Sequence, residues 1–291
     1  MPVYDNDTQG SERRLVDLGK RVKVSLDKLG LDPRANPADF GIWIDHSFST
    51  EDAGRRIHLY RDGTMGSVLD MGYAAAREFA ATRRPFSVSI FDDKVTCLGG
   101  MDEGNARNFI DRHKRHRFGG TQYTPVLQDI VATAGFGNVD LGSLPGTRRL
   151  IKERQLITPE VIGWFGRVKQ EAVYSSAVWA ESGPFSVKAT ARRPFNAIII
   201  TDGEPMDPQQ GIIDYLKLMS QLPIFVQFIG VGPHRFTFLK KLDTMEGRFV
   251  DNANFFDSKD AHGNIDTMLD LMLGEFPDYC KKARKLGLIT G

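Results

Sequence analysis

Residues 40–49 read FGIWIDHSFS, an apolar run that stops at Asp45 and is followed by two serines at alternate positions. A second run, Phe195–Thr201 (FNAIIIT), stops in the same way at Asp202. Continuous apolar runs of this length are typical of strands buried on both faces of a sheet. Asp45 and Asp202 therefore each follow a predicted strand directly, although they are far apart along the chain. The rest of the sequence is interpreted from this arrangement.

Strand and helix patterns alternate around these two runs. Strands are expected at 40–44, 86–91, 195–201, 224–231 and 249–256, and helices at 63–81, 104–116, 124–134, 208–222, 236–242, 265–273 and 277–286. This alternation predicts an α/β fold with a doubly wound, mostly parallel, Rossmann-like sheet and helices on both faces. Such sheets bind ligands at the carboxyl ends of their strands, where the strand order reverses. We therefore expect Asp45 and Asp202 at that edge.

The chain of 291 residues is expected to form one domain with two additions. Residues 1–36 are polar and are interpreted as an N-terminal arm, and residues 37–291 as a single domain. Residues 135–194 break the alternation, because most connections in compact domains run about 4–6 residues. We interpret this segment as an insertion with its own structure, including a helix over Val161–Ala177 that starts near Pro159.

Composition argues against several classes of partner. Lys and Arg number 38 against 37 Asp and Glu, which indicates no specific nucleic acid and no anionic membrane as a partner. The apolar runs are too short to span a bilayer and the N-terminal residues contain no apolar signal segment, so we expect a cytoplasmic protein. Cys97 and Cys280 match no zinc or redox spacing and are expected to be free thiols.

Three short motifs share one chemistry. Asp45, Ser47 and Ser49 form a D-x-S-x-S pattern, Gly119–Thr121 (GGT) precedes a predicted helix, and Asp202 follows a predicted strand. Mg²⁺ prefers six oxygen ligands and keeps several waters, and hydroxyls at alternate positions can point at one ion. The alternative is that the two aspartates only cap the segments that follow them, which is a common role of aspartate.

Together these motifs resemble the metal-ion-dependent adhesion site (MIDAS) of von Willebrand factor A-type (vWA) domains. The resemblance implies direct ligation of a cation by Ser47, Ser49 and Thr121, and ligation through water by Asp45 and Asp202. It also implies Mg²⁺ as the ion, with Mn²⁺ or Ca²⁺ as alternatives, and a carboxylate of a protein partner as a further ligand.

A narrower resemblance, to the TerF-type vWA proteins of tellurium resistance, covers most of residues 20–134 and 195–289. The segments that carry it are 24–30 (VSLDKLG), 60–63 (YRDG), 119–126 (GGTQYTPV), 200–204 (ITDGE), 226–232 (VQFIGVG), 238–252 (FLKKLDTMEGRFVDN), 255–256 (FF) and 275–277 (EFP). The chain departs from this family at Phe48 and Thr50, where a glycine and a methionine are usual, and in the inserted segment 135–194.

Two classes of function are consistent with these features. The first is a non-catalytic, Mg²⁺-dependent protein-binding module that captures an acidic group of a partner. The resemblance implies a tellurium-resistance or stress-response setting for it, with other tellurium-resistance-type proteins as candidate partners. The alternative is a Mg²⁺-dependent phosphoryl-transfer or hydrolase enzyme at the same edge.

Two observations favour the module over an enzyme. Hydroxyls are the expected direct ligands, whereas metal-dependent hydrolases normally use carboxylates. The sequence also presents no Ser/His/Asp set, Cys/His set or GxxxxGK[ST] phosphate loop. A structural subunit with an empty site is a third hypothesis, because Phe48 places a ring beside the ion.

Several other residues have both a functional and a structural interpretation. The basic run Arg112–Arg117 (RHKRHR) suits phosphate binding or a solvated helix end. His46 suits a catalytic base or a structural role, and the structural role is favoured. Glu204 and Asp251 are candidates either for supporting the metal ligands or for turn and capping roles.

Overall fold

The computed structural model describes residues 8–79, 86–102, 105–106, 109–112, 119–137 and 190–290, together with short strands between 148 and 181. The chain divides into two compact units, one made of Met1–Asn138 and Ala189–Gly291 and the other of Val139–Lys188. All candidate site residues belong to the first unit.

The first unit alternates strands with helices. Its strands are β1 (Asp39–Asp45), β2 (Phe86–Phe91), β3 (Val95–Met101), β10 (Phe195–Thr201), β11 (Ile224–Gly230) and β12 (Ala253–Asp257). Its α-helices are α1 (Thr8–Lys28), α2 (Thr64–Phe79), α3 (Phe109–Arg112), α4 (Thr124–Val131), α5 (Gln209–Met219), α6 (Thr237–Thr244), α7 (Ile265–Leu273) and α8 (Phe276–Lys285). Short turns of helix are η1 (Phe48–Glu51), η2 (Ala53–Arg55), η3 (Ala132–Phe136) and η5 (Ser258–Ala261). None of the helices in the described part of the chain is long and apolar enough to cross a membrane.

Six strands form one sheet in the order β12–β11–β10–β1–β2–β3. All neighbours run parallel except β2 and β3. The chain moves outward from β1 to β3 and later returns to the middle at β10, so the strand order reverses between β1 and β10. This arrangement confirms the predicted doubly wound, mostly parallel α/β fold, and it puts the ends of β1 and β10 at the switch point.

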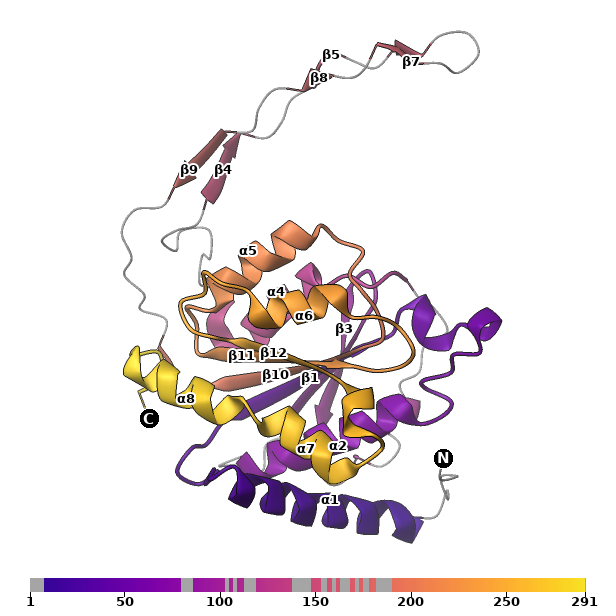
Figure 1. Ribbon diagram of the computed structural model, residues 1–291, viewed down its shortest axis with the longest axis vertical. Coiled ribbons are helices and arrows are strands. Elements are labelled where there is room, and N and C mark those ends of the chain that lie inside the picture. The colour runs from indigo at the N-terminus through magenta and orange to yellow at the C-terminus, as the bar shows by residue number, and fades with distance from the viewer. Residues whose placement is uncertain are drawn as a thin grey trace. The chain divides into compact units, whose positions relative to one another are not determined.

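Helices cover both faces of the sheet, with α4, α5 and α6 on one side and α1, α2, α7 and α8 on the other (Figure 1). Side chains of β1 alternate between these layers. Trp43 faces α4, where its Nε1 donates to Asp129 Oδ2 at 2.8 Å. Ile42 faces α2, where its Cδ1 lies 2.6 Å from the position that a Cβ atom would take at Gly72. Glycine at this position therefore lets α2 lie close to the sheet.

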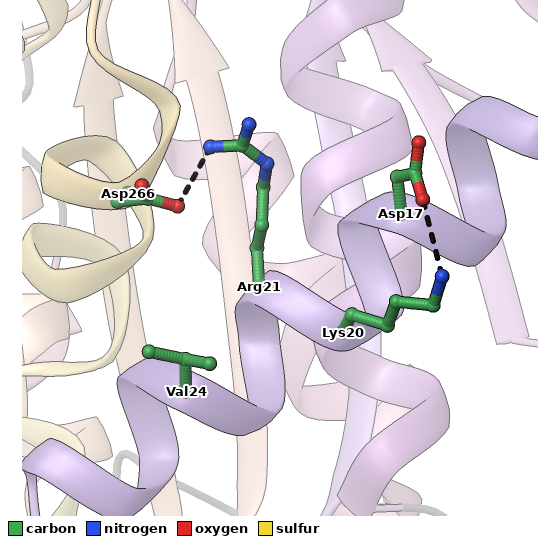
Figure 2. Close-up of a pocket in the computed structure, with 5 residues that line it drawn as sticks. All are labelled: Asp17, Lys20, Arg21, Val24 and Asp266. Carbon is green, nitrogen blue, oxygen red and sulfur yellow. Dashed lines mark hydrogen bonds and ion pairs between the residues drawn. The ribbon is translucent and has the colours of Figure 1, made fainter.

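Helix α1 lies within the predicted arm (1–36) and is docked on the first unit. Arg21 donates to Asp266 of α7 at 2.9 Å, and Figure 2 shows this contact reaching from one helix to the other. The same two side chains line a surface pocket together with Asp17, Lys20 and Val24 of α1. The predicted boundaries of the arm, the 37–291 domain and the 135–194 insertion stay predictions.

Some elements of the first unit differ from the sequence-based expectation. Strand β3 is not predicted, because it is a half-exposed edge strand with two glycines and without a clear apolar alternation. The last strand begins at Ala253 and not at Phe249. Of the helix expected at 104–116, the structure describes the short helix α3, and the rest lies largely outside the described residues.

The described residues of the second unit form strands. They pair as β4 (Arg148–Lys152) with β9 (Val178–Glu181), β5 (Leu156–Thr158) with β8 (Val173–Tyr174), and β6 (Val161–Ile162) with β7 (Val168–Gln170), all antiparallel. The predicted helix over Val161–Ala177 is therefore wrong for the residues that the structure describes. Val and Ile are the most frequent residues in these strands, and their strand preference outweighs an apolar spacing that also fits a helix.

Candidate metal centre

The carboxylates of Asp45 and Asp202 lie close together at the carboxyl ends of two neighbouring strands, β1 and β10. Thr201, which precedes Asp202, donates its hydroxyl hydrogen to Asp45 Oδ2 at 2.6 Å. The backbone N–H of Ser47 donates to Asp45 Oδ1 at 2.8 Å. The strand register thus brings two acids from distant parts of the chain to one edge of the sheet, as the sequence predicts.

Three hydroxyls converge on these carboxylates. Ser47 Oγ and Ser49 Oγ are 3.0 Å apart, and Ser49 Oγ donates to Asp202 Oδ1 at 2.9 Å. Ser49 Oγ and Thr121 Oγ1 each lie 3.8 Å from the position that a Cβ atom would take at Gly203. The structure therefore gathers all five predicted residues into one group, called here the five-residue cluster: Asp45, Ser47, Ser49, Thr121 and Asp202.

The cluster is buried and its negative charge is poorly compensated. Neither Asp45 nor Asp202 has exposed surface. Burial raises the pKa of Asp45, and burial together with the neighbouring charge of Asp45 raises the pKa of Asp202 to about 7. The Oδ2 atom of Asp202 is buried and has no hydrogen-bond partner among the described residues. A cation at this place would offset both the burial penalty and the repulsion, so the cluster fits a positively charged ligand.

The donor set also indicates which kind of cation fits. Among the described residues, no three His, Cys, Asp or Glu side chains gather into a group that could hold a metal by themselves. The five-residue cluster instead offers hydroxyl and carboxylate oxygens. Such oxygens suit hard cations such as Mg²⁺, which keep part of their water, whereas zinc sites normally include thiolate or imidazole ligands.

Asp93 holds the glycine-rich loop that carries Thr121. Its Oδ1 atom accepts a hydrogen bond from the N–H of Gly120 at 2.8 Å, and its Oδ2 atom would lie 2.5 Å from a Cβ atom at Gly119. The same loop meets the first motif, because the N–H of Phe48 donates to the carbonyl of Gly119 at 3.0 Å. Sequence reasoning marks residues 92–93 only as a turn, and their position after a predicted strand was the available signal for a role at this edge.

Hydrogen bonds to Asp207 hold the loop after β10 against the start of α4. Its carboxylate accepts hydrogen bonds from the N–H of Tyr123 at 3.1 Å and the N–H of Thr124 at 2.7 Å. The N–H of Met206 donates to the carbonyl of Thr121 at 2.8 Å. The loops that follow Asp202 and surround Thr121 are thus held against each other. Sequence reasoning misses Asp207, because it caps a helix that begins 83 residues earlier in the chain.

His46 has a structural role in the first motif. It is buried, and its ring lies edge-on to Tyr60 with 5.0 Å between ring centroids. The Tyr60 hydroxyl donates to the carbonyl of Asp45 at 2.6 Å. These contacts support the backbone that carries the first motif and favour the structural interpretation of His46 over a catalytic one.

His234, in the loop after β11, lies close to the carboxylate oxygen of Asp202 that has no hydrogen-bond partner among the described residues. Its Nε2 atom is 3.7 Å from Asp202 Oδ2. Burial lowers the pKa of His234, and the charges of Arg55 and Lys259 lower it further. His234 is therefore harder to protonate than an ordinary imidazole, which limits how far it can compensate the charge of Asp202.

The other acidic candidates have structural roles. Glu204 accepts hydrogen bonds from the N–H of Phe238 at 2.9 and 3.2 Å and thereby caps α6. Asp251 forms an ion pair with Arg248 at 2.6 Å. Glu204 thus follows the capping interpretation, whereas Asp251 is held in an ion pair that the sequence does not predict. The side chains of the basic run Arg112–Arg117 lie outside the described residues.

Comparisons with known proteins bear on the family. A family model described as the vWA found in the TerF C terminus matches residues 161–289, a range that includes Asp202 but none of the other four cluster residues. The uncharacterized protein YcbR of Bacillus subtilis (strain 168) is 25% identical over 281 residues, which are 94% of this chain and 90% of that protein.

Two solved structures are also similar to the chain. Proximal thread matrix protein 1 from the mussel byssus is 13% identical with a TM-score of 0.42, over 81% of this chain and 46% of that one. The VWA domain of SpRpn10 is 10% identical with a TM-score of 0.41, over 76% of this chain and 87% of that one. The chain thus spans about half the length of the mussel protein.

The family match agrees with the motifs found in the sequence and with the doubly wound sheet whose switch point carries them. Residues 161–289 match the TerF-like type of the von Willebrand factor A domain family, and the chain resembles that family in its motifs and in its doubly wound sheet.

Proposed function

We propose that this protein is a Mg²⁺-dependent protein-binding module that captures an acidic group of a partner at the five-residue cluster. One observation carries the proposal: three hydroxyls converge beside two buried carboxylates, and one carboxylate oxygen, Asp202 Oδ2, lacks a hydrogen-bond partner among the described residues. Buried polar atoms in native proteins are normally paired, so such an atom calls for a ligand.

The chemistry of the cluster divides its residues into two groups. Ser47, Ser49 and Thr121 would hold the cation directly through neutral oxygens, and Asp45 and Asp202 would hold its water ligands. A bound Mg²⁺ supplies a coordination position that favours an anionic oxygen, because its direct protein ligands are neutral. A carboxylate of a protein partner is the ligand proposed for that position, with Mn²⁺ or Ca²⁺ as possible substitutes for the ion.

The proposal assigns no catalytic role to the cluster. The serine hydroxyls bond to each other and to Asp202, and among the described residues no hydrogen bond joins them to an imidazole. A nucleophilic serine needs such a base within hydrogen-bond reach. The match of residues 161–289 to a TerF-like model makes other tellurium-resistance-type proteins candidate partners, and a cytoplasmic location is part of the same proposal.

Cation binding by Thr121 variants tests this function. Thr121→Val removes the hydroxyl with little change in volume, whereas Thr121→Ser keeps it. We expect isothermal titration with Mg²⁺, and the paramagnetic signal of Mn²⁺, to detect binding to the wild type and to Thr121→Ser but not to Thr121→Val. Thr244→Val is the matched control, since its hydroxyl bonds to the carbonyl of Lys240 on α6 and lies outside the cluster.

Equal cation binding by wild type and Thr121→Val would refute the assignment of the site. Magnesium-dependent turnover of phosphoesters or nucleotides by the purified protein, lost in Thr121→Val, would instead establish the enzyme alternative. Melting curves of each variant without cation separate loss of binding from loss of fold.

A further inference from the structure

Two large apolar side chains flank the five-residue cluster and are unusually exposed. Met206 is 75% exposed and Phe48 is 63% exposed, more than any other described large apolar residue. Phe48 stands between Ser47 and Ser49 in the sequence, and Met206 follows Asp202 by four positions. Exposed apolar side chains of this size, next to a candidate ligand site, are a signature of an interaction surface.

Phe48 and Met206 meet the same short segment of the chain. The N–H of Phe48 donates to the carbonyl of Gly119 at 3.0 Å, and the N–H of Met206 donates to the carbonyl of Thr121 at 2.8 Å. The sulfur of Met206 would also collide with any Cβ atom at Gly120. The sulfur of Met206 therefore lies beside the Gly119–Thr121 loop, and Phe48 is bonded to the same loop through its backbone.

The charges near the cluster are mixed until a cation is bound. Arg55 and Lys259 act on His234 from one side, and Asp52 and Asp45 act on it with the opposite sign. A divalent cation in the cluster would offset the charges of Asp45 and Asp202 and offer a coordination position to an anionic oxygen. An acidic group that approaches the cluster is therefore attracted, while its neighbouring residues must pass over Phe48 and Met206.

We propose that Phe48 and Met206 form an apolar rim that selects a peptide segment in which an Asp or Glu is flanked by large aliphatic side chains. The acidic group of that segment would reach the cation, and its aliphatic neighbours would pack on the rim. This inference rests on the proposed function and adds to it the sequence character of the partner. Burial of these aliphatic side chains against the rim would remove apolar surface from water and so add affinity to that of the acidic group.

Two synthetic peptides with blocked ends test the rim. One has a single aspartate between two leucines, and the other has serines in place of the leucines. Binding is measured by fluorescence anisotropy in saturating Mg²⁺ and again in EDTA. We expect the leucine peptide to bind the wild type about tenfold more tightly than the serine peptide, and only in the presence of Mg²⁺.

Three protein variants test whether Phe48 and Met206 cause the difference in affinity between the two peptides. Phe48→Ser and Met206→Ser should each weaken binding of the leucine peptide about tenfold and leave Mg²⁺ affinity unchanged. Val24→Ser on α1 is the control, because Val24 is 53% exposed but lines the pocket of Figure 2 and not the site loops. It should bind both peptides as the wild type does.

The outcomes separate the rim from the proposed function. If Mg²⁺ binds but the two peptides bind equally, or neither binds, the rim is overturned and cation binding stands. If the leucine peptide binds equally well in EDTA, or if Mg²⁺ does not bind, the metal-dependent function itself fails and the rim inference fails with it.

Discussion

Two groups of acidic residues in the first unit both contain carboxyls with raised pKa values and differ in what surrounds them. In the five-residue cluster, Asp202 keeps one buried oxygen without a described partner. In the second group, which we call the acidic group (Asp243, Asp251 and Glu275), the charge of Arg248 acts on Asp243 and Glu275. Arg248 donates to the carbonyls of Asp243, Met245 and Ala253 and pairs with Asp251 at 2.6 Å.

Burial raises carboxyl pKa values in both groups, for Asp202 in the first and for Asp243 and Glu275 in the second. Raised pKa values therefore do not distinguish a binding site from a structural ion-pair network. What distinguishes them is whether the protein completes the hydrogen bonding by itself. Arg248 pairs with Asp251 and bonds to three backbone carbonyls, whereas Asp202 Oδ2 in the five-residue cluster has no partner among the described residues.

The largest effect on stability is expected when Arg248 is removed from the acidic group. Arg248→Ala removes a side chain that is only 7% exposed and leaves the carbonyls of Asp243, Met245 and Ala253 without this donor. The free energy of unfolding should fall by about 3 kcal/mol, because several acceptors lose a charged hydrogen-bond donor at once. Urea denaturation measures this loss, while Mg²⁺ affinity at 25 °C should stay that of the wild type. A loss of Mg²⁺ binding in a folded Arg248→Ala protein would show that the two groups are not independent.

The second-largest effect should be a gain in the free energy of unfolding. Asp202→Asn removes a buried charge that Asp45 repels, and it keeps an oxygen that can accept from Ser49. At pH 8 without metal, we expect this variant to be more stable than the wild type, by on the order of 2 kcal/mol. Added Mg²⁺ should stabilise the wild type only. A destabilised Asp202→Asn protein would contradict the idea of an uncompensated carboxylate.

The pH dependence of stability provides a third, smaller effect. The pKa of Asp202 is raised in the folded protein to about 7, so the folded state binds a proton more tightly than the unfolded chain. Its protonated form therefore stabilises the fold at low pH, and this contribution is lost as the pH rises toward 7. Without metal, the stability of the wild type relative to Asp202→Asn should fall by about 1 kcal/mol per pH unit between about pH 5 and 6. A flat difference across this range would contradict the raised pKa.

The smallest effect is expected from Asp207, which positions the loops around the five-residue cluster and is not a candidate metal ligand. Asp207→Ala removes the acceptor for the N–H groups of Tyr123 and Thr124 at the start of α4. Loss of such a helix cap should lower the free energy of unfolding by about 1 kcal/mol. Because Asp207 positions Thr121 only indirectly, Mg²⁺ affinity should fall by about tenfold and not vanish. Asp207→Asn, which keeps an acceptor, should recover most of both losses in the same titration and denaturation experiments.

The parts of this fold that could be predicted are those with an uninterrupted apolar signal. Strands β2 and β10 and helix α7 have the predicted bounds, because their side chains are buried on one or both faces. The convergence of the five cluster residues was also predictable, since parallel strands that meet at a switch point end at one edge. Binding of a cation there stays a prediction.

The missed features depend on contacts that the sequence does not display. Strand β3 is half-exposed and pairs along one side only, so its composition is not that of a buried strand. Asp93 and Asp207 act on loops that are distant in the sequence, and no spacing rule connects them to Thr121. In the second unit, short paired strands were taken for a helix, because apolar residues at intervals of three or four satisfy both patterns over short stretches.

The nested strands of the second unit have a thermodynamic consequence for the chain that joins β1 to β10. Asp45 and Thr201, which meet at the switch point, are 156 residues apart, and Val139–Lys188 lies between them in the sequence. The entropy lost on closing a flexible loop grows only with the logarithm of its length, so this segment adds roughly 0.3 kcal/mol to that closure. A whole structural unit can thus be lengthened, exchanged or removed at this position during evolution with almost no change in the stability of the sheet.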